Sequence, residues 1–260
     1  MPKNVRPKKH LGQHFLTDTD TANRIADALV CSNGGTVIEV GPGMGVLTGR
    51  LLERFGERLH VVEIDTESVE YLSKKFASLV PRIISDDFLR TDLSKLSDGS
   101  ISVIGNFPYN ISSQILFHIL DYREHVTEIT GMFQKEVAIR LTSGPGNRDY
   151  GILSVLMGAF YHSEYLFSVP PHVFDPPPKV NSGVIRFIRR EGIVLPCSPV
   201  TFRKIVKMAF NQRRKTLRNA LSAVWCEEME ASGLGGQRAE QLTVDQFWEL
   251  ACLEDTKNRH

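Results

Sequence analysis

Residues 36–52, TVIEVGPGMGVLTGRLL, decide the fold because they pass from an apolar run through a glycine-rich turn into a helical pattern. The β-branched residues of Thr36–Ile38 predict a short buried strand. Apolar residues from Val46 to Leu52 then recur at the spacing of one helix face. A strand, a tight turn and a helix in this order form the first unit of a doubly wound fold. The sequence therefore predicts an α/β protein with a parallel sheet.

The turn itself, GPGMG at residues 41–45, is unlike the phosphate-binding turn of dinucleotide-binding proteins. Its glycine spacing is G-x-G-x-G rather than G-x-G-x-x-G, which argues against a nicotinamide dehydrogenase. Pro42 lacks the backbone N–H that a pyrophosphate would use, and Glu39 adds a negative charge just before the turn. Gly41 and Gly43 let a ligand approach the backbone closely. We therefore expect a ligand that carries no phosphate and has a positive charge, such as a sulfonium.

Acidic side chains follow the next two apolar runs. Glu63 belongs to the run at residues 59–65, about 20 residues after the glycine turn, where a carboxylate binds ribose hydroxyls in doubly wound folds. Asp87 follows the run at residues 82–85, and its carboxylate can accept an exocyclic N–H of adenine while the ring of Phe88 lies against the base. Taken singly, each acid is compatible with a solvated loop. Because the carboxyl ends of parallel strands meet at one edge of a sheet, together they predict a site for S-adenosylmethionine.

A further strand end is followed by GNFPYN at residues 105–110, after the run at residues 100–104. The side-chain oxygen of Asn106 can accept one N–H of a planar amine, and a backbone carbonyl beside Pro108 can accept another. Pro108 restricts the backbone, and the ring of Tyr109 can stack on a base. For this motif alone, a proline turn with an Asn cap and a core tyrosine is the alternative. Its place beside the predicted cofactor site favours a site for the amino group of a base.

Composition and cysteine usage limit the class of protein. The chain has 260 residues, of which 42% are hydrophobic and 23% charged, which is typical of a globular protein with one large and one small domain. No apolar run approaches the roughly 20 residues of a membrane span, and the basic N-terminus lacks the apolar core of a signal peptide. The cysteines are scattered, without a C-x-x-C pair or metal-ligand spacing. We therefore expect a cytoplasmic monomer with no membrane segment and no metal.

Basic residues are unevenly distributed, although the net charge is only +1. The segment before Asp18 and residues 192–226 contain no acid but many Lys and Arg side chains. Residues 210–219, FNQRRKTLRN, mix guanidinium, amide and hydroxyl groups, which suit phosphate and ribose contacts. A solvated cationic helix face is the alternative. We predict a nucleic-acid-binding surface that includes Lys8, Lys9, Arg203, Lys207, Arg213, Arg214, Lys215 and Arg218.

Two kinds of pattern divide the chain. Strand and helix patterns alternate to about Leu141, and helical patterns dominate beyond residues 188–199, where the composition shifts. We therefore predict a first domain at residues 1–190 and a small helical domain at residues 191–260. The predicted helices lie at residues 19–30, 67–76, 112–120, 135–141, 152–160, 200–210, 215–224 and 243–253, the last of which opens with a capping box.

A proline-dense loop, PPHVFDPPPKV at residues 170–180, lies between the predicted strands 164–169 and 183–188. The short connection predicts an antiparallel edge of the sheet. The proline content makes the loop stiff, so it is at least a rigid connection. In a functional role it would hold Phe174 over a target base, opposite Tyr109.

Motifs along nearly the whole chain resemble those of the ribosomal RNA adenine N6-dimethyltransferases, in particular the bacterial enzymes of the small ribosomal subunit. The hexapeptide LGQHFL at residues 11–16 and the proline loop are the most specific of these motifs, whereas the glycine turn is generic to methyltransferases. Further matching segments are Glu39–Gly45, Val62–Asp65, Asp87–Leu89, Asn106–Asn110, Gln134–Ala138, Tyr150–Gly151 and Phe210–Lys215.

The resemblance implies a Rossmann-like class I methyltransferase sheet with a small C-terminal all-helical domain. It implies N6,N6-dimethylation of adjacent adenosines in the ribosomal RNA of immature small subunits, with S-adenosylmethionine as the methyl donor. Carried onto this chain, it assigns donor binding to Gln13, His14, Leu16, Glu39, Gly41, Gly43, Glu63, Ile64, Asp87, Phe88 and Asn106. It assigns catalytic roles to Asn106, Pro108, Tyr109 and Phe174.

Two residues depart from the family pattern. His14 stands where Asn is the commoner residue; both side chains offer a donor and an acceptor, but their pH behaviour differs. Asp86 stands where a glycine is common, which leaves the choice between Asp86 and Asp87 as the adenine ligand open.

Other functions are compatible with parts of the sequence. A ribosome-assembly factor that acts mainly by binding would use the same basic surface, although Asn106 and the intact glycine turn favour catalysis. A methyltransferase acting on DNA adenine or on a glutamine amide would use a similar Asn-x-Pro-Tyr motif, but the basic tail and the proline loop argue against a protein substrate. A large-subunit ribosomal RNA dimethyltransferase of the antibiotic-resistance type would share the catalytic motifs.

Overall fold

The computed structural model describes residues 5–31, 34–97 and 99–257. The chain divides into two compact units, one made of residues 1–138 and 163–189 and the other of residues 139–162 and 190–260. The predicted functional domains, 1–190 and 191–260, stay a prediction. Among the described residues, no helix is long and apolar enough to cross a lipid bilayer.

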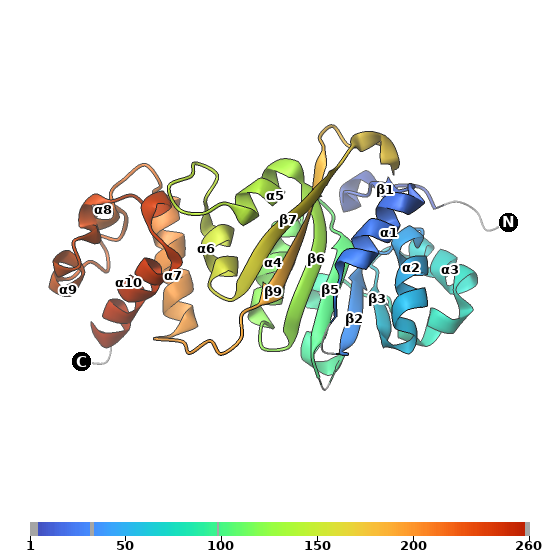
Figure 1. Cartoon of the computed structure of the whole chain (residues 1–260), viewed down its shortest axis with the longest axis horizontal. Coiled ribbons are helices and arrows are strands. Elements are labelled where there is room, and N and C mark those ends of the chain that lie inside the picture. The colour runs from blue at the N-terminus through green and yellow to red at the C-terminus, as the bar shows by residue number, and fades with distance from the viewer. Residues whose placement is uncertain (1–4, 32–33, 98, 258–260) are drawn as a thin grey trace. The chain divides into compact units, whose positions relative to one another are not determined.

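A seven-stranded sheet organises the first unit (Figure 1). Its parallel part contains the strand pairs β4–β3, β3–β2, β2–β5 and β5–β6, and β9 then pairs antiparallel with β6. This confirms the α/β architecture and the antiparallel edge. In spatial order the strands are β4 (Ile83–Ile84), β3 (Leu59–Val62), β2 (Thr36–Val40), β5 (Ile101–Asn106), β6 (Val126–Gln134), β9 (Ser182–Arg189) and β7 (Tyr161–Val169).

Helices cover both faces of this sheet, because its strands are apolar on both sides. Val37 and Ile104 belong to an apolar cluster with α1 (Thr19–Ala28) and α2 (Val46–Phe55). Their neighbours in the strands, such as Ile38 and Val103, point to the opposite face and are also 0% exposed. Figure 1 shows α1 and α2 on one side of the strands and α4 (Ser112–Asp121) on the other.

Side-chain caps and a glycine define where the helices begin. Asp18 accepts a hydrogen bond from the Thr21 backbone N–H at 2.7 Å and so caps α1. Asp65 caps α3 (Thr66–Lys75) in the same way. Gly45 precedes α2 with φ +71°, and a Cβ there would lie 2.6 Å from the ring of Phe76. The chain can therefore turn from β2 into α2 only with a glycine at this place.

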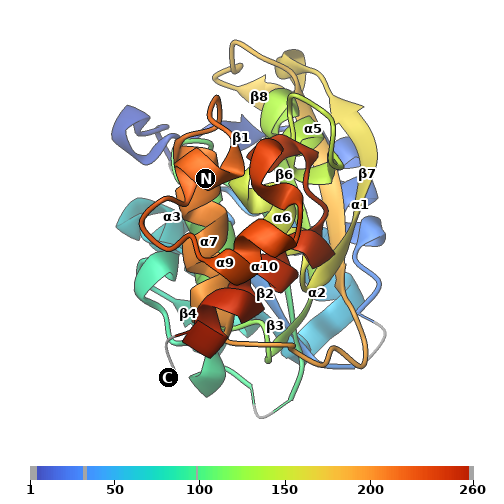
Figure 2. The ribbon, with the colours of Figure 1, turned by 90° about the vertical axis from the view of Figure 1, so that its left-hand side faces the viewer.

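Helices make up most of the second unit, as Figure 2 shows. Several of them pack through aromatic rings. The rings of Phe202 and Trp248 stack at 3.8 Å between centroids. The predicted capping box is confirmed: the Thr243 N–H donates to Gln246 Oε1, and the Gln246 N–H donates to Thr243 Oγ1. The helices are α6 (Ile152–Gly158), α7 (Pro199–Asn211), α8 (Leu217–Ala220), α9 (Glu227–Ala231) and α10 (Val244–Lys257), and α5 (Lys135–Thr142) crosses from the first unit into the second.

The predicted helix at residues 215–224 is wrong in length, since only Leu217–Ala220 is helical. The Leu217 N–H donates to the carbonyl of Gln237 at 2.7 Å, and the Trp225 indole donates to Glu230 at 2.9 Å. These bonds stabilise turns on both sides of α8, and the spacing of apolar residues along the sequence gives no indication of them.

Candidate active site

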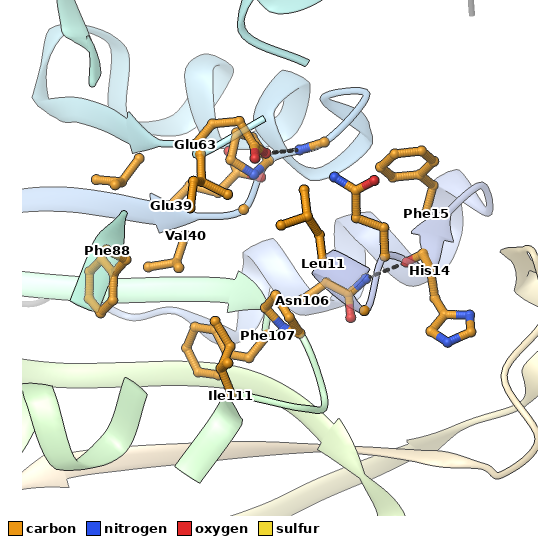
Figure 3. Close-up of a pocket in the computed structure, with 18 of the residues that line it drawn as sticks. Leu11, His14, Phe15, Glu39, Val40, Glu63, Phe88, Asn106, Phe107 and Ile111 are labelled. Carbon is orange, nitrogen blue, oxygen red and sulfur yellow. Dashed lines mark hydrogen bonds between the residues drawn. The ribbon is translucent and has the colours of Figure 1, made fainter. Parts of the chain in front are cut away.

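A pocket lies in the first unit at the carboxyl ends of β2, β3 and β5 (Figure 3). Its lining is formed mainly by apolar side chains, with a few carboxyl and amide groups among them. All of its walls come from one compact unit. The lining consists of residues 10–16, 25, 39–44, 46–47, 62–64, 86–89 and 106–111.

The floor of the pocket is the glycine turn. Gly41 has φ +66° and Gly43 has φ +55°, conformations that side chains with a Cβ rarely adopt. A Cβ on Gly43 would lie 2.8 Å from the ring of Phe15, whereas a Cβ on Gly41 would meet no atom within 4 Å. The turn therefore packs against the N-terminal segment at Gly43 and leaves space above Gly41.

Glu63 is held in place by backbone donors. Its Oε2 accepts the N–H of Gly43 at 3.1 Å, and its Oε1 accepts the N–H of Asp65 at 2.9 Å. Burial raises the pKa of Glu63, and these two hydrogen bonds oppose the rise. Each carboxylate oxygen has a second lone pair, so Glu63 can also accept hydroxyl groups of a ligand.

Glu39 is almost completely buried, with 1% of its surface exposed. Burial raises its pKa to about 8; the Thr48 hydroxyl opposes this shift and the nearby Glu63 adds to it. Among the described residues, its Oε2 has no hydrogen-bond partner. A buried carboxyl that lacks a partner suits a ligand with a polar or positively charged group.

Two acids and one ring follow β4. Asp87 Oδ1 accepts the N–H of Leu89 at 2.9 Å, and Asp86 Oδ1 accepts the N–H of Asp87 at 2.7 Å. Phe88 is buried against the edge of His118, with ring centroids 5.3 Å apart. Asp86 is exposed and Asp87 is half-buried, and both line the pocket. The choice between them as a ligand therefore stays open.

The N-terminal segment closes the pocket through long-range bonds. The Lys8 ammonium lies 2.5 Å from Asp65 Oδ1, and Gln13 Nε2 donates to Asp65 Oδ2 at 3.2 Å. Burial acts to raise the pKa of Asp65, but the bonds from Lys8 and Gln13 hold it below the ordinary value. Asn106 Nδ2 donates to the backbone carbonyl of His14 at 2.9 Å, which Figure 3 shows. Lys8, predicted as a nucleic-acid contact, is thus engaged in an ion pair.

The loop after β5 has its aromatic residues in two environments. Phe107 is fully buried and packs edge-on against Phe133, with centroids 5.2 Å apart. Tyr109 is half-buried, its hydroxyl lies 2.5 Å from Ser182 Oγ, and its ring stacks on that of His14. The bond from Asn106 Nδ2 to His14 leaves the amide oxygen Oδ1 as the acceptor of the Asn106 side chain.

The structure brings the predicted donor-binding and catalytic residues together, with one exception. Phe174 was expected over a base, opposite Tyr109, but it is 4% exposed and absent from the pocket wall. It forms β8 (Phe174–Asp175), which pairs antiparallel with β1 (Phe15–Leu16), and its ring belongs to the apolar core cluster. The residues at the pocket are Gln13, His14, Leu16, Glu39, Gly41, Gly43, Glu63, Ile64, Asp87, Phe88, Asn106, Pro108 and Tyr109.

The predicted basic residues of the second unit differ in their surroundings. Arg213 Nε lies 2.7 Å from Glu240 Oε2, and Arg218 forms an ion pair with Glu230. Arg214 and Lys215 are exposed, and neither has an acidic partner among the described residues. On α7, Lys207 is exposed and Arg203 is half-buried; Lys9, in the first unit, is also exposed.

Sequence reasoning missed several residues that shape the pocket. Leu11, Phe15 and Ile111 line it, but isolated apolar residues carry no local signal of such a role. Gly12 has φ +65°, and a Cβ there would lie 2.3 Å from Asn110 Oδ1. The glycine in the LGQHFL motif is thus explained by close contact with the loop after β5.

The residues present fit S-adenosylmethionine. The space above Gly41 admits a ligand close to the backbone. Glu39 offers a buried carboxyl oxygen that has no partner in the part of the chain that the structure describes. Glu63 supplies a second buried carboxyl at the position where such folds bind ribose. Among the described residues, no group of three or more His, Cys, Asp or Glu side chains is placed to hold a metal ion.

Comparisons with known proteins agree with this geometry. Residues 4–252 match the protein family described as ribosomal RNA adenine dimethylase. The ribosomal RNA small subunit methyltransferase A of Parabacteroides distasonis is 53% identical over 251 residues, which cover 96% of this chain and 94% of that protein.

Two solved structures share the fold. A dimethyladenosine transferase from Plasmodium falciparum superimposes with a TM-score of 0.79 and 22% identity, covering 95% of this chain and 98% of that one. The 23S rRNA methyltransferase ErmE gives a TM-score of 0.69 and 24% identity, covering 93% and 99%. They support a seven-stranded methyltransferase sheet followed by C-terminal helices, as the sequence resemblance implied.

Glu39→Gln is expected to change how stability depends on pH. Burial keeps the pKa of Glu39 at about 8 in the folded protein, above the ordinary value of 4.5. Between these values the folded protein holds a proton that the unfolded chain has released. The free energy of unfolding should therefore fall as pH rises from about 5 to 8, by at most about 1.4 kcal/mol per pH unit. Glutamine cannot ionise, so the variant should lose less stability over this window.

Chemical denaturation at several pH values checks this expectation. Glu57→Gln, which changes an exposed glutamate, is the matched control and should follow the wild type. If Glu39→Gln and the wild type had the same pH dependence, Glu39 would be ionised in the folded protein, contrary to its burial.

Proposed function

The chain belongs to the ribosomal RNA adenine dimethylase family, and we propose that it dimethylates N6 of adjacent adenosines in the RNA of immature small ribosomal subunits. Family membership makes it an S-adenosylmethionine-dependent ribosomal RNA adenine dimethyltransferase. The small-subunit substrate is supported by a relative of that name that matches nearly the whole chain. The observation that carries the proposal is the Asn106 amide, held by His14 at the end of β5 beside a pocket that fits the methyl donor.

Donor binding is divided among the strand ends. Glu63, already oriented by Gly43 and Asp65, accepts the ribose hydroxyls. Asp87 accepts the exocyclic N–H of the donor's adenine, and Phe88 lies beside the ring. Glu39 faces the cationic end, and contact with a positive charge would lower its pKa and favour its ionised form. The remaining proposed donor contacts are Gln13, the backbone of His14, Leu16, Gly41, Ile64 and Asn106.

Catalysis depends on positioning, because the sulfonium of the donor supplies the electrophilic methyl group. The N6 lone pair is delocalised into the adenine ring and is a weak nucleophile. Asn106 Oδ1 and a backbone carbonyl at Phe107 or Pro108 accept the N6 hydrogens and favour a pyramidal nitrogen. Tyr109 stacks on the base after it leaves its own stack. The methylated nitrogen is strongly acidic and releases its proton to water, so no strong general base is required.

The second methyl transfer uses the same acceptors. After one methylation a single N–H remains, and either Asn106 Oδ1 or the backbone carbonyl can accept it. The nitrogen must then present its lone pair to a fresh donor molecule, so donor exchange separates the two steps.

Phe174 is proposed to contact the base only after β8 moves from the core, because its ring is buried in this structure.

RNA binding is proposed for the predicted basic residues, of which Lys9, Lys207, Arg214, Lys215 and Arg218 are exposed. Their charges neutralise phosphates without reading sequence. Arg203, Arg213 and Arg218 contribute where their remaining N–H groups are accessible. A cytoplasmic location and a monomeric state complete the proposal and stay predictions.

An assembly factor that only binds is the second candidate, because it would use the same basic residues. It would have no use for an amide held at the end of β5, which favours the enzyme.

Asn106→Ala is expected to slow methyl transfer by at least about 100-fold, because it removes an acceptor that acts on the reacting nitrogen. RNA affinity should stay within about two-fold of the wild type, since the basic residues are unchanged. Single-turnover kinetics give the rate of methyl transfer, and filter binding gives the affinity for RNA. Asn147→Ala, an exposed change in the second unit, is the control. Near-normal turnover of Asn106→Ala with both substrates bound would contradict the mechanism.

Replacing Arg214 and Lys215 together by alanine is expected to weaken RNA binding about ten-fold at low salt and to reduce the salt slope by about 2. Lys74→Ala with Lys95→Ala removes the same charge from exposed positions of the first unit and is the matched control. Anisotropy titrations at several KCl concentrations give the slopes. Equal slopes for the two double variants would place the RNA elsewhere.

The proposed substrate is tested with labelled S-adenosylmethionine and immature small subunits, with large subunits and free ribosomal RNA in parallel. Nucleoside analysis should find dimethyladenosine in small subunits. Label in large-subunit RNA would instead indicate an enzyme of the resistance type. Tight binding to small subunits without label would indicate an assembly factor.

A further inference from the structure

The side chain of His14 points away from the cofactor pocket, although the family pattern assigns this position to donor binding. Figure 3 shows its imidazole turned away from Glu39 and Glu63, while its backbone carbonyl faces Asn106. The ring nitrogen Nδ1 lies 2.7 Å from the carbonyl oxygen of Pro176 in the proline loop. A carbonyl can only accept, so Nδ1 carries the proton and donates it. The backbone and the side chain of His14 thus serve different parts of the molecule.

The imidazole stacks on the ring of Tyr109. The ring centroids are 5.7 Å apart and the planes differ by 28°, which lies within the favourable range for offset aromatic pairs. At its other end, Tyr109 is held by the 2.5 Å bond between its hydroxyl and Ser182 Oγ, and Ser182 is 0% exposed. The plane of the Tyr109 ring is therefore fixed by two contacts, one at the hydroxyl and one at the ring.

The distance between the rings of His14 and Tyr109 determines whether a base can stack between them. A base inserted between parallel rings needs them about 7 Å apart, twice the contact distance of carbon atoms. The observed centroid distance of 5.7 Å is too short for that. A base that stacks on Tyr109 must therefore use the side of the ring that His14 does not cover.

We propose that His14 is a positioning residue for the target adenine, acting through Tyr109, and that its side chain is not a ligand of the methyl donor. This inference rests on the proposed function for its target base. The imidazole packs on one face of Tyr109 and donates a hydrogen bond to the proline loop. The backbone carbonyl of His14 accepts the hydrogen bond that orients Asn106. One residue thereby aligns the stacking ring with the amide that accepts the N6 hydrogens.

A double-mutant cycle tests the coupling between the two rings. Four proteins are compared: wild type, His14→Ala, Tyr109→Ala and the double variant, with single-turnover rates on immature small subunits. His14→Ala should slow transfer about ten-fold. If His14 acts through Tyr109, the double variant should be no slower than Tyr109→Ala alone, within about two-fold. If the rate losses of the two single variants multiplied in the double variant, the proposal would be overturned.

His14→Phe separates the ring from the anchoring bond. Phenylalanine retains the aromatic contact with Tyr109 but cannot donate to Pro176, so the rate should fall only about three-fold. A rate as low as that of His14→Ala would show that the stacking contact contributes nothing and would overturn the proposal. His162→Ala, at an exposed imidazole outside the site, is the control.

Calorimetric binding of S-adenosylmethionine without RNA separates this inference from the proposed function. The dissociation constants of His14→Ala and wild type should agree within about two-fold. A loss of about ten-fold or more would make the side chain a donor ligand and overturn the inference, whatever the enzyme methylates. Absence of dimethyladenosine with the wild type would refute the proposed function, and calorimetry would still decide whether His14 is a donor ligand.

Discussion

The hydrogen bond from the Asn106 amide to the His14 carbonyl joins the end of β5 to the N-terminal segment. It uses one of the two N–H groups of the amide and so orients the amide oxygen, which is the acceptor offered to a substrate. It also holds the segment that forms one wall of the pocket. The wall of the donor site and the orientation of the acceptor group therefore depend on one contact between residues far apart in sequence.

Charge balance is the second constraint on this edge of the sheet. Glu39, Glu63 and Asp65 are all buried, and burial alone disfavours three negative charges so close together. Lys8 and Gln13 satisfy Asp65, and backbone donors satisfy Glu63. Within the described part of the chain, Glu39 is the carboxyl of these three with an oxygen that has no partner. We expect a cationic donor to place its positive charge beside this carboxyl, so that binding offsets the unfavourable free energy of burying it.

The sequence predicted the parts of the structure that depend on local pattern. The strand before the glycine turn, the acids after β3 and β4 and the motif after β5 were all found, because chain order and the parallel sheet bring strand ends to one edge. Long-range pairing was not predictable. Phe174 was expected at the site but is buried by the pairing of β8 with β1, and Lys8 is engaged by Asp65. Neither partner is near in sequence, so no periodicity or composition indicates the contact.

The pocket at the carboxyl edge of the sheet is proposed to bind the methyl donor through the carboxylates that follow its strands. A crystal structure of the chain with S-adenosylhomocysteine would locate the ligand. We expect ribose hydroxyls bonded to Glu63 and an adenine ring beside Phe88, with its amino group at Asp87 or Asp86. Ligand density outside this pocket, or a ribose with no contact to Glu63, would contradict this proposal.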